Sequence, residues 1–432
     1  MNDMQRLARL MKELEDQLVV CMRCGMCQAV CPLYAETGRE SDVARGKLAL
    51  LDGLLQQMFA DPYGVHERLN KCLLCGSCAS NCPSGVKTLE IFLKARAILG
   101  GYLGLPPLKQ VLFRGLLTNP ALFDRLIRWG AKLQGAFLRP ADSLLGSSCA
   151  RFQSPLAERH IKPLASVSLR RRTGELDLSG RSGVKVAFFV GCLVDKIFPG
   201  VGEAVLKSLK HHGVGVFLPE EQGCCGIPAL SAGDLGSFTE LVQYHLQRFE
   251  HSSWDFLITA CATCTATIKK IWPMMGQGLS PRQQDQVRQW ADKTMDISAF
   301  LVDRMGVTLP VDRVSPDATI SYHDPCHLKK SLGVAAQPRT LLRANSKRRL
   351  VEMAEADRCC GCGGSFSLQH YQISASITRR KRDHIVQSGC QEVATACPAC
   401  MLQITDALSQ ARDPIRVRHV IEVYAESLPM SE

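Results

Sequence analysis

Two runs of cysteine with identical spacing occupy the first hundred residues, and they constrain the fold more than any other feature of the sequence. The first run is Cys21, Cys24, Cys27 and Cys31, and the second is Cys72, Cys75, Cys78 and Cys82. Each cysteine of the second run follows its counterpart by the same interval (72 − 21 = 51), and a proline follows the last cysteine of both runs. Such a repeat predicts two copies of one metal-binding loop.

The spacing C-x2-C-x2-C-x3-C-P, present twice, is typical of ferredoxins that hold two [4Fe-4S] clusters, where the fourth cysteine of each run ligates the other cluster. Paired zinc ribbons also use C-x2-C, but zinc does not require three cysteines and a Cys-Pro in each run. We therefore predict cluster one at Cys21, Cys24, Cys27 and Cys82, and cluster two at Cys72, Cys75, Cys78 and Cys31.

A second, longer repeat fills the remainder of the chain. Its first copy holds Cys192, Cys224, Cys225, Cys261 and Cys264, and its second copy holds Cys326, Cys359, Cys360, Cys397 and Cys400. The interval between copies stays nearly constant, from 326 − 192 = 134 to 400 − 264 = 136. Each copy is therefore predicted to be one structural module.

Alternating apolar and helical segments predict the architecture of these modules. Residues 185–194, 215–218 and 256–260 are typical of buried strands, with helices expected at 202–211 and 238–249. The second copy repeats the pattern with strands near 319–323, 349–353 and 392–396. This alternation indicates parallel α/β units, in which the cysteines follow the carboxyl ends of strands, where open α/β folds place ligand sites.

We expect an α+β multidomain chain: a mainly helical ferredoxin domain at 1–100, a helical connector and linker at 101–182, module 1 at 183–310 and module 2 at 311–432. Residues 102–139 combine apolar and basic side chains and predict two or three amphipathic helices, which either pack between the halves or dock on a membrane surface or partner. Residues 141–182, rich in Ser and Arg, are predicted to be a linker.

Composition limits the function classes. The 21 cysteines are clustered, and residues 1–20 are charged without a signal-peptide pattern, so we expect free thiols in a cytoplasmic protein. No apolar run reaches the ~18 residues that a membrane span needs, which leaves membrane contact that is peripheral or made through a partner. The net charge of +11 is dispersed and aromatic residues are only 6%, so nucleic acid is not an expected partner.

The order of these parts resembles the iron–sulfur subunit of glycolate oxidase and of D-lactate dehydrogenase. The resemblance covers nearly the whole chain and is carried by residues 21–32, 45–46, 72–86, 223–226 (GCCG) and 359–361 (CCG). Related proteins with the same parts are the third subunit of anaerobic glycerol-3-phosphate dehydrogenase, the lactate-utilisation iron–sulfur proteins and a subunit of heterodisulfide reductase.

The resemblance implies an oxidoreductase subunit that relays electrons. The 2-hydroxy acid would be oxidised on a partner FAD-binding dehydrogenase chain, and electrons would leave towards the quinone pool or another carrier. The alternative is a chain like heterodisulfide reductase or the glycerol-3-phosphate dehydrogenase subunit, whose modules carry redox catalysis. In agreement with the relay, no G-x-G-x-x-G dinucleotide fingerprint follows a predicted strand.

The metal content of the modules stays open at this stage. Both modules keep five cysteines, and in the heterodisulfide reductases such sets hold a non-cubane iron–sulfur cluster, which implies one or two additional clusters here. Zinc and metal-free structural cysteine are the alternatives. His323 and His327, beside Cys326, are either ligands or proton-transfer groups or ordinary structural histidines.

Overall fold

The computed structural model describes residues 3–152, 158–309, 316 and 318–429. Within these residues the chain forms two compact units. Unit 1 comprises Met1–Thr118, Gly226–Leu241 and Gly361–Ile377, and unit 2 comprises Asn119–Cys225, Val242–Cys360 and Thr378–Glu432. The predicted boundary between residues 310 and 311 lies outside the described residues, as do residues 153–157 of the predicted linker.

Unit 1 is helical. The short helices α3 (Met26–Val30) and α7 (Ser77–Ser80) each contain the third cysteine of a run, at equivalent positions, and they pack against each other. The long helices α5 (Ala44–Leu55) and α8 (Thr88–Leu103) carry the apolar core. Around them lie α1 (Asp3–Met11), η1 (Lys12–Leu14), α2 (Glu15–Leu18), α4 (Pro32–Thr37), η2 (Glu40–Asp42), α6 (Pro62–Asn70), α9 (Pro107–Gln110) and η3 (Val111–Leu117).

Two segments from the second half of the sequence complete unit 1. Helix α14 (Ile227–Ser231) packs on α8, and Gly233 approaches Gly100 so closely that a Cβ on Gly100 would lie 2.6 Å from the Gly233 carbonyl oxygen. Helix α21 (Ser365–Gln369) belongs to the second segment. Both segments begin at the glycine of a Cys-Cys-Gly sequence, Gly226 or Gly361, and both glycines have a left-handed backbone, with φ of 90° and 91°.

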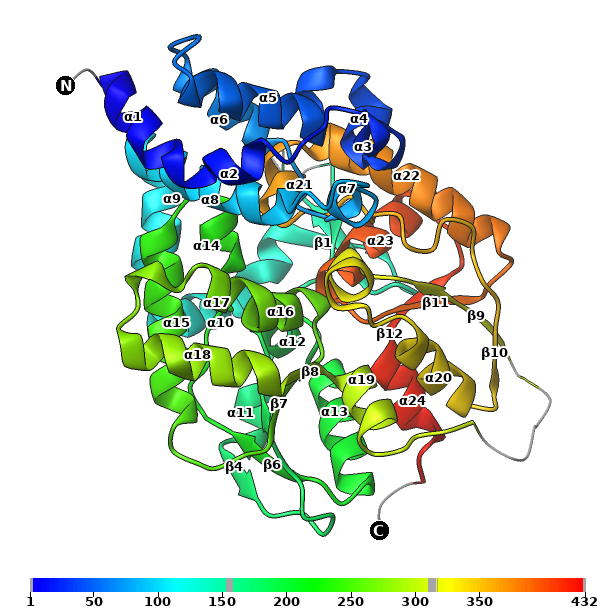
Figure 1. Ribbon diagram of the computed structural model, residues 1–432. Helices are drawn as coiled ribbons and strands as arrows, with labels where there is room; N and C mark the ends of the chain where they lie inside the picture. Colours follow the sequence, from blue (N-terminus) through cyan, green and yellow to red (C-terminus); the bar gives the residue numbers. More distant parts are fainter. Residues whose placement is uncertain (1–2, 153–157, 310–315, 317, 430–432) are drawn as a thin grey trace. The chain divides into compact units, whose positions relative to one another are not determined.

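Unit 2 contains two mainly parallel sheets with the same strand order (Figure 1). The first has the order β4-β6-β5-β7-β8, built from β4 (Leu176–Leu178), β5 (Lys185–Phe188), β6 (Gly215–Leu218), β7 (Phe256–Thr259) and β8 (Thr294–Asp296). The second has the order β10-β9-β11-β12, built from β9 (Ala318–His323), β10 (Arg348–Leu350), β11 (Glu392–Thr395) and β12 (Arg416–His419). Without the antiparallel edge strand β4, the two orders are equivalent, which confirms the repeated parallel α/β modules.

Equivalent helices of the two modules pack in a reciprocal way. Helix α24 (Val420–Ser427) of module 2 packs against α13 (Pro199–His211) of module 1, and α19 (Ile297–Asp303) of module 1 packs against α20 (Ala336–Ala344) of module 2 (Figure 1). Asp296 and His419 end β8 and β12, and the side chain of each caps the helix that follows. The modules are therefore related by an approximate twofold arrangement.

The segment between the repeats contains more structure than its composition indicates. Strands β1 (Leu138–Asp142), β2 (Ser147–Ala150) and β3 (His160–Ile161) form an antiparallel sheet, and α11 (Leu169–Thr173) precedes β4. The sheet is fixed to α23 (Pro398–Ala411), because the amide of His160 donates to Asp406 at 2.8 Å and the hydroxyls of Ser147 and Ser409 lie 2.6 Å apart. These strands could not be predicted from the Ser- and Arg-rich composition of the segment, because they are stabilised by contacts with a helix far along the chain.

The predicted amphipathic helices are present as α9, η3 and α10 (Pro120–Phe137). Helix α10 has no buried residue. Among the described residues, no helix combines the length and apolar character that crossing a bilayer demands.

Candidate iron–sulfur sites

Two neighbouring cavities in unit 1 are lined by the cysteines of the ferredoxin-like runs. Cavity A, about 460 Å³ including its opening to solvent, is lined by Cys31, Cys72, Cys75 and Cys78. Cavity B, about 380 Å³ on the same measure, is lined by Cys21, Cys24, Cys27 and Cys82. Ala44, Cys78 and Thr88 line both cavities, so the two lie side by side. Each cavity thus gathers three cysteines of one run and the fourth of the other.

The backbone around the two cavities repeats residue by residue. Arg23 and Leu74, each one residue before the second cysteine of its run, adopt left-handed φ angles of 56° and 53°. Gly25 and Gly76, one residue after it, have φ of 84° and 71° and begin α3 and α7. Non-glycine residues rarely adopt positive φ, and such backbone strain concentrates at ligand-binding loops. The repeated conformation folds each loop around its cavity.

The thiols of cavity A receive more hydrogen bonds than those of cavity B. Backbone amides donate to Cys31 from Tyr34 at 3.5 Å and to Cys72 from Leu74 at 3.4 Å. Side-chain hydroxyls approach Cys75 (Ser77, 3.4 Å) and Cys78 (Thr88, 3.0 Å). In cavity B, the amide of Val86 donates to Cys82 at 3.4 Å. Hydrogen bonds to sulfur stabilise negative charge on a thiolate or a cluster.

Two buried cations adjoin cavity A. Lys47 is 1% exposed, lines the cavity, and donates to the carbonyl oxygen of Asp42. Arg96 is 3% exposed and donates to the carbonyl oxygens of Cys72 at 2.7 Å and Ser231 at 2.8 Å. Burial lowers the pKa of Lys47, and the neighbouring Cys72 and Cys31 thiols oppose this shift. Sequence reasoning missed both residues, although Arg96 shares the apolar face of α8 with Phe92 and Leu99, and a charge on such a face is a recognisable signal.

These surroundings fit an anionic iron–sulfur cluster in each cavity. Burial raises the pKa of the Cys31 thiol to about 12 and raises that of Cys78 still more, so neither site favours free thiolates. Metal-bound cysteine is deprotonated, and the buried cations and N–H groups of cavity A would compensate that charge. Four thiols per cavity match the four ligands that a [4Fe-4S] cluster takes.

The module cysteines of unit 2 form one connected run of thiols. Cys192 and Cys224 lie 4.0 Å apart at one end, and Cys360 and Cys400 lie 3.3 Å apart at the other. Direct side-chain interactions link the members in the order Cys192, Cys224, Cys225, Cys264, Cys261, Cys397, Cys400 and Cys360. The half-buried Cys326 and the buried Cys359 complete the predicted ten. The two modules thus meet at Cys261 and Cys397, which are equivalent positions of the repeat.

Cys397 lies at the centre of this run. Its contacts with Cys261 and Cys400 hold its pKa well below the ordinary range for cysteine. Cys400 is shifted in the opposite direction: contacts with Cys360 and Cys397, together with burial, raise its pKa. Cys397 also lies at the N-cap of α23, where a helix favours negative charge.

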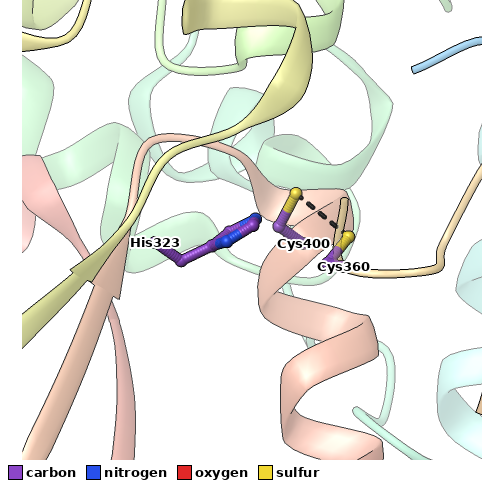
Figure 2. Close-up of side chains that lie close together, drawn as sticks. All are labelled: His323, Cys360 and Cys400. Carbon is purple, nitrogen blue, oxygen red and sulfur yellow. Dashed lines mark hydrogen bonds between the residues drawn. The ribbon is translucent and has the colours of Figure 1, made fainter. Parts of the chain in front are cut away.

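The two modules differ beside these cysteines. His323, at the end of β9, is fully buried, and its ring points towards Cys400 and Cys360 (Figure 2). Burial and the nearby Lys381 lower the pKa of His323 to about 3. His327 instead contacts the Thr263 hydroxyl through Nδ1 at 3.3 Å. At the position of module 1 that corresponds to His323 stands Phe189, which packs against His245 and Trp272.

The sequence matches two known domain families. The 4Fe-4S dicluster domain matches residues 17–86, and the cysteine-rich domain matches twice, at residues 186–269 and 320–405. With the geometry of the cavities, these matches define the class: an iron–sulfur protein with a dicluster domain followed by two cysteine-rich domains.

Curated relatives narrow this class. The probable glycolate oxidase iron–sulfur subunit of Bacillus subtilis is 27% identical, with 98% of both chains covered. Lactate utilization protein A of an Exiguobacterium species is 32% identical over 56% of this chain and 98% of the relative. A fumarate reductase (CoM/CoB) subunit of Methanothermobacter marburgensis is 29% identical over 93% of this chain and 71% of the relative. The chain belongs to the family of iron–sulfur oxidoreductase subunits that includes the glycolate oxidase iron–sulfur subunit and lactate utilization protein A.

Proposed function

We propose that this chain is the electron-relay subunit of a flavin-dependent 2-hydroxy-acid dehydrogenase that acts on D-lactate or glycolate. The observation that carries the proposal is the pair of adjoining four-cysteine cavities, which share Cys78 and Thr88 in their walls. The ligands would be Cys21, Cys24, Cys27 and Cys82 for cluster one and Cys72, Cys75, Cys78 and Cys31 for cluster two.

Bound [4Fe-4S] clusters supply one-electron transfer, so the two electrons that a flavin takes from a hydroxy acid leave it singly. The chain's own residues set the conditions for this transfer. Lys47 and Arg96 offset negative charge at cavity A, and the amides of Leu74 and Tyr34 stabilise its sulfurs. The apolar walls of cavity A, among them Leu33, Leu73 and Phe92, limit access of water.

Substrate oxidation is assigned to a partner FAD-binding chain. The two named relatives, a glycolate oxidase subunit and a lactate utilization protein, support this substrate class. The absence of a dinucleotide fingerprint from the sequence supports the division between an oxidising chain and a relay chain.

The test is reduction of the clusters by substrate. The protein would be purified anaerobically from its own cells together with the chains that accompany it, and D-lactate, glycolate, L-lactate or glycerol 3-phosphate would be added while EPR follows the clusters. Reduction by D-lactate or glycolate, accompanied by stoichiometric FAD, is the expected result. Reduction by glycerol 3-phosphate alone would favour the glycerol-3-phosphate dehydrogenase alternative, and a preparation without iron would exclude the relay.

A second candidate function is redox catalysis by the modules, as in a heterodisulfide-reductase-like subunit. It is favoured by the connected run of thiols from Cys192 to Cys360 and by the complete five-cysteine sets, which would hold one or two additional non-cubane clusters. The relative named as a fumarate reductase (CoM/CoB) subunit supports this direction. Turnover of a disulfide by the isolated chain with an artificial reductant would distinguish catalysis from relay.

We infer that α10 makes a peripheral contact with the inner face of the cell membrane, where electrons would reach the quinone pool. Leu126, Trp129 and Phe137 are 49%, 64% and 60% exposed, and Leu122 and Leu133 extend the same apolar stripe. The single acidic residue of α10, Asp124, forms ion pairs with Arg170 and Lys196 at 2.8 Å. The other charged residues of the helix are all basic: Arg125, Arg128 and Lys132. An apolar stripe with Trp and flanking cations suits anionic lipid. Sedimentation with vesicles containing anionic lipid, lost in Trp129→Glu, would support this contact.

A further inference from the structure

The starting observation is a buried, unsatisfied imidazole in module 2. His323 is fully buried, and neither Nδ1 nor Nε2 has a hydrogen-bond partner among the described residues. The carbonyl oxygen of Ala356 is near the imidazole of His323 and favours its protonated form, but the two groups do not meet the geometry of a hydrogen bond. Buried polar groups are nearly always paired, so an unpaired one in a folded protein indicates a partner such as a metal ion.

The neighbours of this ring are metal-binding groups. A ring nitrogen of His323 and the Sγ atoms of Cys360 and Cys400 all lie within 4.8 Å of one another, and the three side chains converge from a strand end, a loop and the first turn of a helix (Figure 2). Two thiolates that share one tetrahedral ion at 2.3 Å stand ~3.8 Å apart. The 3.3 Å separation of the Cys360 and Cys400 sulfurs is close to that distance.

Module 1 provides an internal comparison. Its equivalents of Cys360 and Cys400 are Cys225 and Cys264, and its equivalent of His323 is Phe189. A Cβ on Gly191 would contact both the Cys264 sulfur, at 3.1 Å, and the Phe189 ring, at 3.8 Å, so the phenyl ring lies beside the cysteine as the imidazole does in module 2. The fold therefore accepts an apolar ring at this position, and a histidine there is not required for packing.

We propose that His323, Cys360 and Cys400 bind one transition-metal atom through an imidazole nitrogen and two thiolate sulfurs. The fourth position of a tetrahedral site would be open to a further ligand. Mixed nitrogen and sulfur ligands in tetrahedral geometry suit zinc or iron. The atom is either a zinc ion or one iron of a larger centre, and both have the same ligands. This site goes beyond the proposed relay, because it uses no residue of the ferredoxin cavities.

The test uses the full chain, purified anaerobically after growth with added iron and zinc, as wild type, His323→Phe and His327→Gln. His323→Phe copies module 1, and His327→Gln is the control because His327 is the other histidine of the same sequence segment. Iron and zinc per chain are measured, and a nitrogen ligand is sought by pulsed EPR for iron or by X-ray absorption for zinc. In the wild type and the control, we expect a metal in addition to the ferredoxin irons, with one histidine nitrogen among its ligands. In His323→Phe, the affinity for this metal should be at least tenfold lower.

The possible results distinguish a zinc ion from an iron centre, and they distinguish failure of this proposal from failure of the proposed relay. Zinc with a nitrogen ligand identifies a mononuclear site. Iron beyond that of the ferredoxin clusters, with a nitrogen coupling that changes on ¹⁵N-histidine labelling, identifies a redox centre. Either result supports the proposal. A wild type without metal beyond the ferredoxin irons, or with a centre that lacks nitrogen, overturns it. The labelled wild type decides the question even if His323→Phe does not fold, and the ferredoxin EPR signal independently reports the proposed relay.

Discussion

The two ferredoxin-like cavities have the same ligand spacing and the same loop conformation, yet their surroundings differ. Cavity A has two buried cations, Lys47 and Arg96, and hydrogen bonds to all four of its cysteines. Cavity B has Arg45 in its wall, which is partly exposed and pairs with Glu40 at 2.6 Å, and its Cys24 is exposed. The ligand spacing therefore predicts the same type of cluster in both cavities, and the different surroundings should give the two clusters different reduction potentials.

The largest expected effect comes from removing a ligand in each cavity. Cys75→Ser in cavity A and Cys24→Ser in cavity B should each lose or degrade one cluster of about four irons. Because Cys75 is buried and Cys24 is exposed, Cys75→Ser should also lower the thermal stability more. Iron and sulfide analysis with EPR provides the measurement. Loss of both signals from either single change would contradict two separate sites.

Arg96→Met should destabilise unit 1, because it leaves the carbonyl oxygens of Cys72 and Ser231 buried without a donor. The expected loss in the free energy of unfolding is ~3 kcal/mol, measured by anaerobic urea denaturation. Lys94→Met on the same helix is the control, since Lys94 pairs with Glu90 near the surface at 2.9 Å and such pairs contribute little. Equal losses in both variants would show that Arg96 has no special role.

Lys47→Gln should lower the reduction potential of cluster two by tens of millivolts, because a buried cation next to an anionic cluster is removed. Arg45→Gln is the matched change at cavity B and should shift the potential of cluster one less, since solvent screens the partly exposed guanidinium. EPR-monitored redox titration of both variants compares the two cavities directly. If Arg45→Gln shifted the reduction potential more than Lys47→Gln, the proposed difference between the two cavities would be wrong.

The smallest expected effect is that of Thr88→Val. The Thr88 hydroxyl lies 3.0 Å from the Cys78 sulfur, and its loss removes one hydrogen bond to cluster two. The potential should fall by less than in Lys47→Gln, while Thr88→Ser should retain the wild-type value because it keeps the hydroxyl. An unchanged potential in Thr88→Val would exclude this hydrogen bond as a determinant.

Local spacing predicted much of this molecule. The two cysteine runs, the repeated α/β modules and the position of the module cysteines after strand ends follow from patterns that extend over a few residues. The strand predicted at 185–194 ends earlier, at Phe188, and the strand predicted near 349–353 is observed as β10, Arg348–Leu350. Apolar loop residues that follow a strand towards a ligand site cannot be separated from the strand by composition.

Long-range partners could not be predicted in this way. Arg96 and Ser231 are 135 residues apart, and β3 depends on Asp406 of α23, 246 residues away. The spacing of cysteines contains no information on such contacts. Sequence analysis also treated His323 and His327 alike, and only the packing separates the buried, unpaired ring from the one that contacts Thr263.

The insertion of Gly226–Leu241 and Gly361–Ile377 into unit 1 has a consequence for how this chain can be divided. Each segment directly follows a module cysteine of unit 2, Cys225 or Cys360, so the chain passes from that cysteine into the helical unit without a spacer. A fragment that ends at Thr118 would expose the face of α8 that α14 covers, and a fragment that begins at Asn119 would retain α14 and α21 without their own core. A single cut in the polypeptide therefore cannot separate the helical unit from the modules.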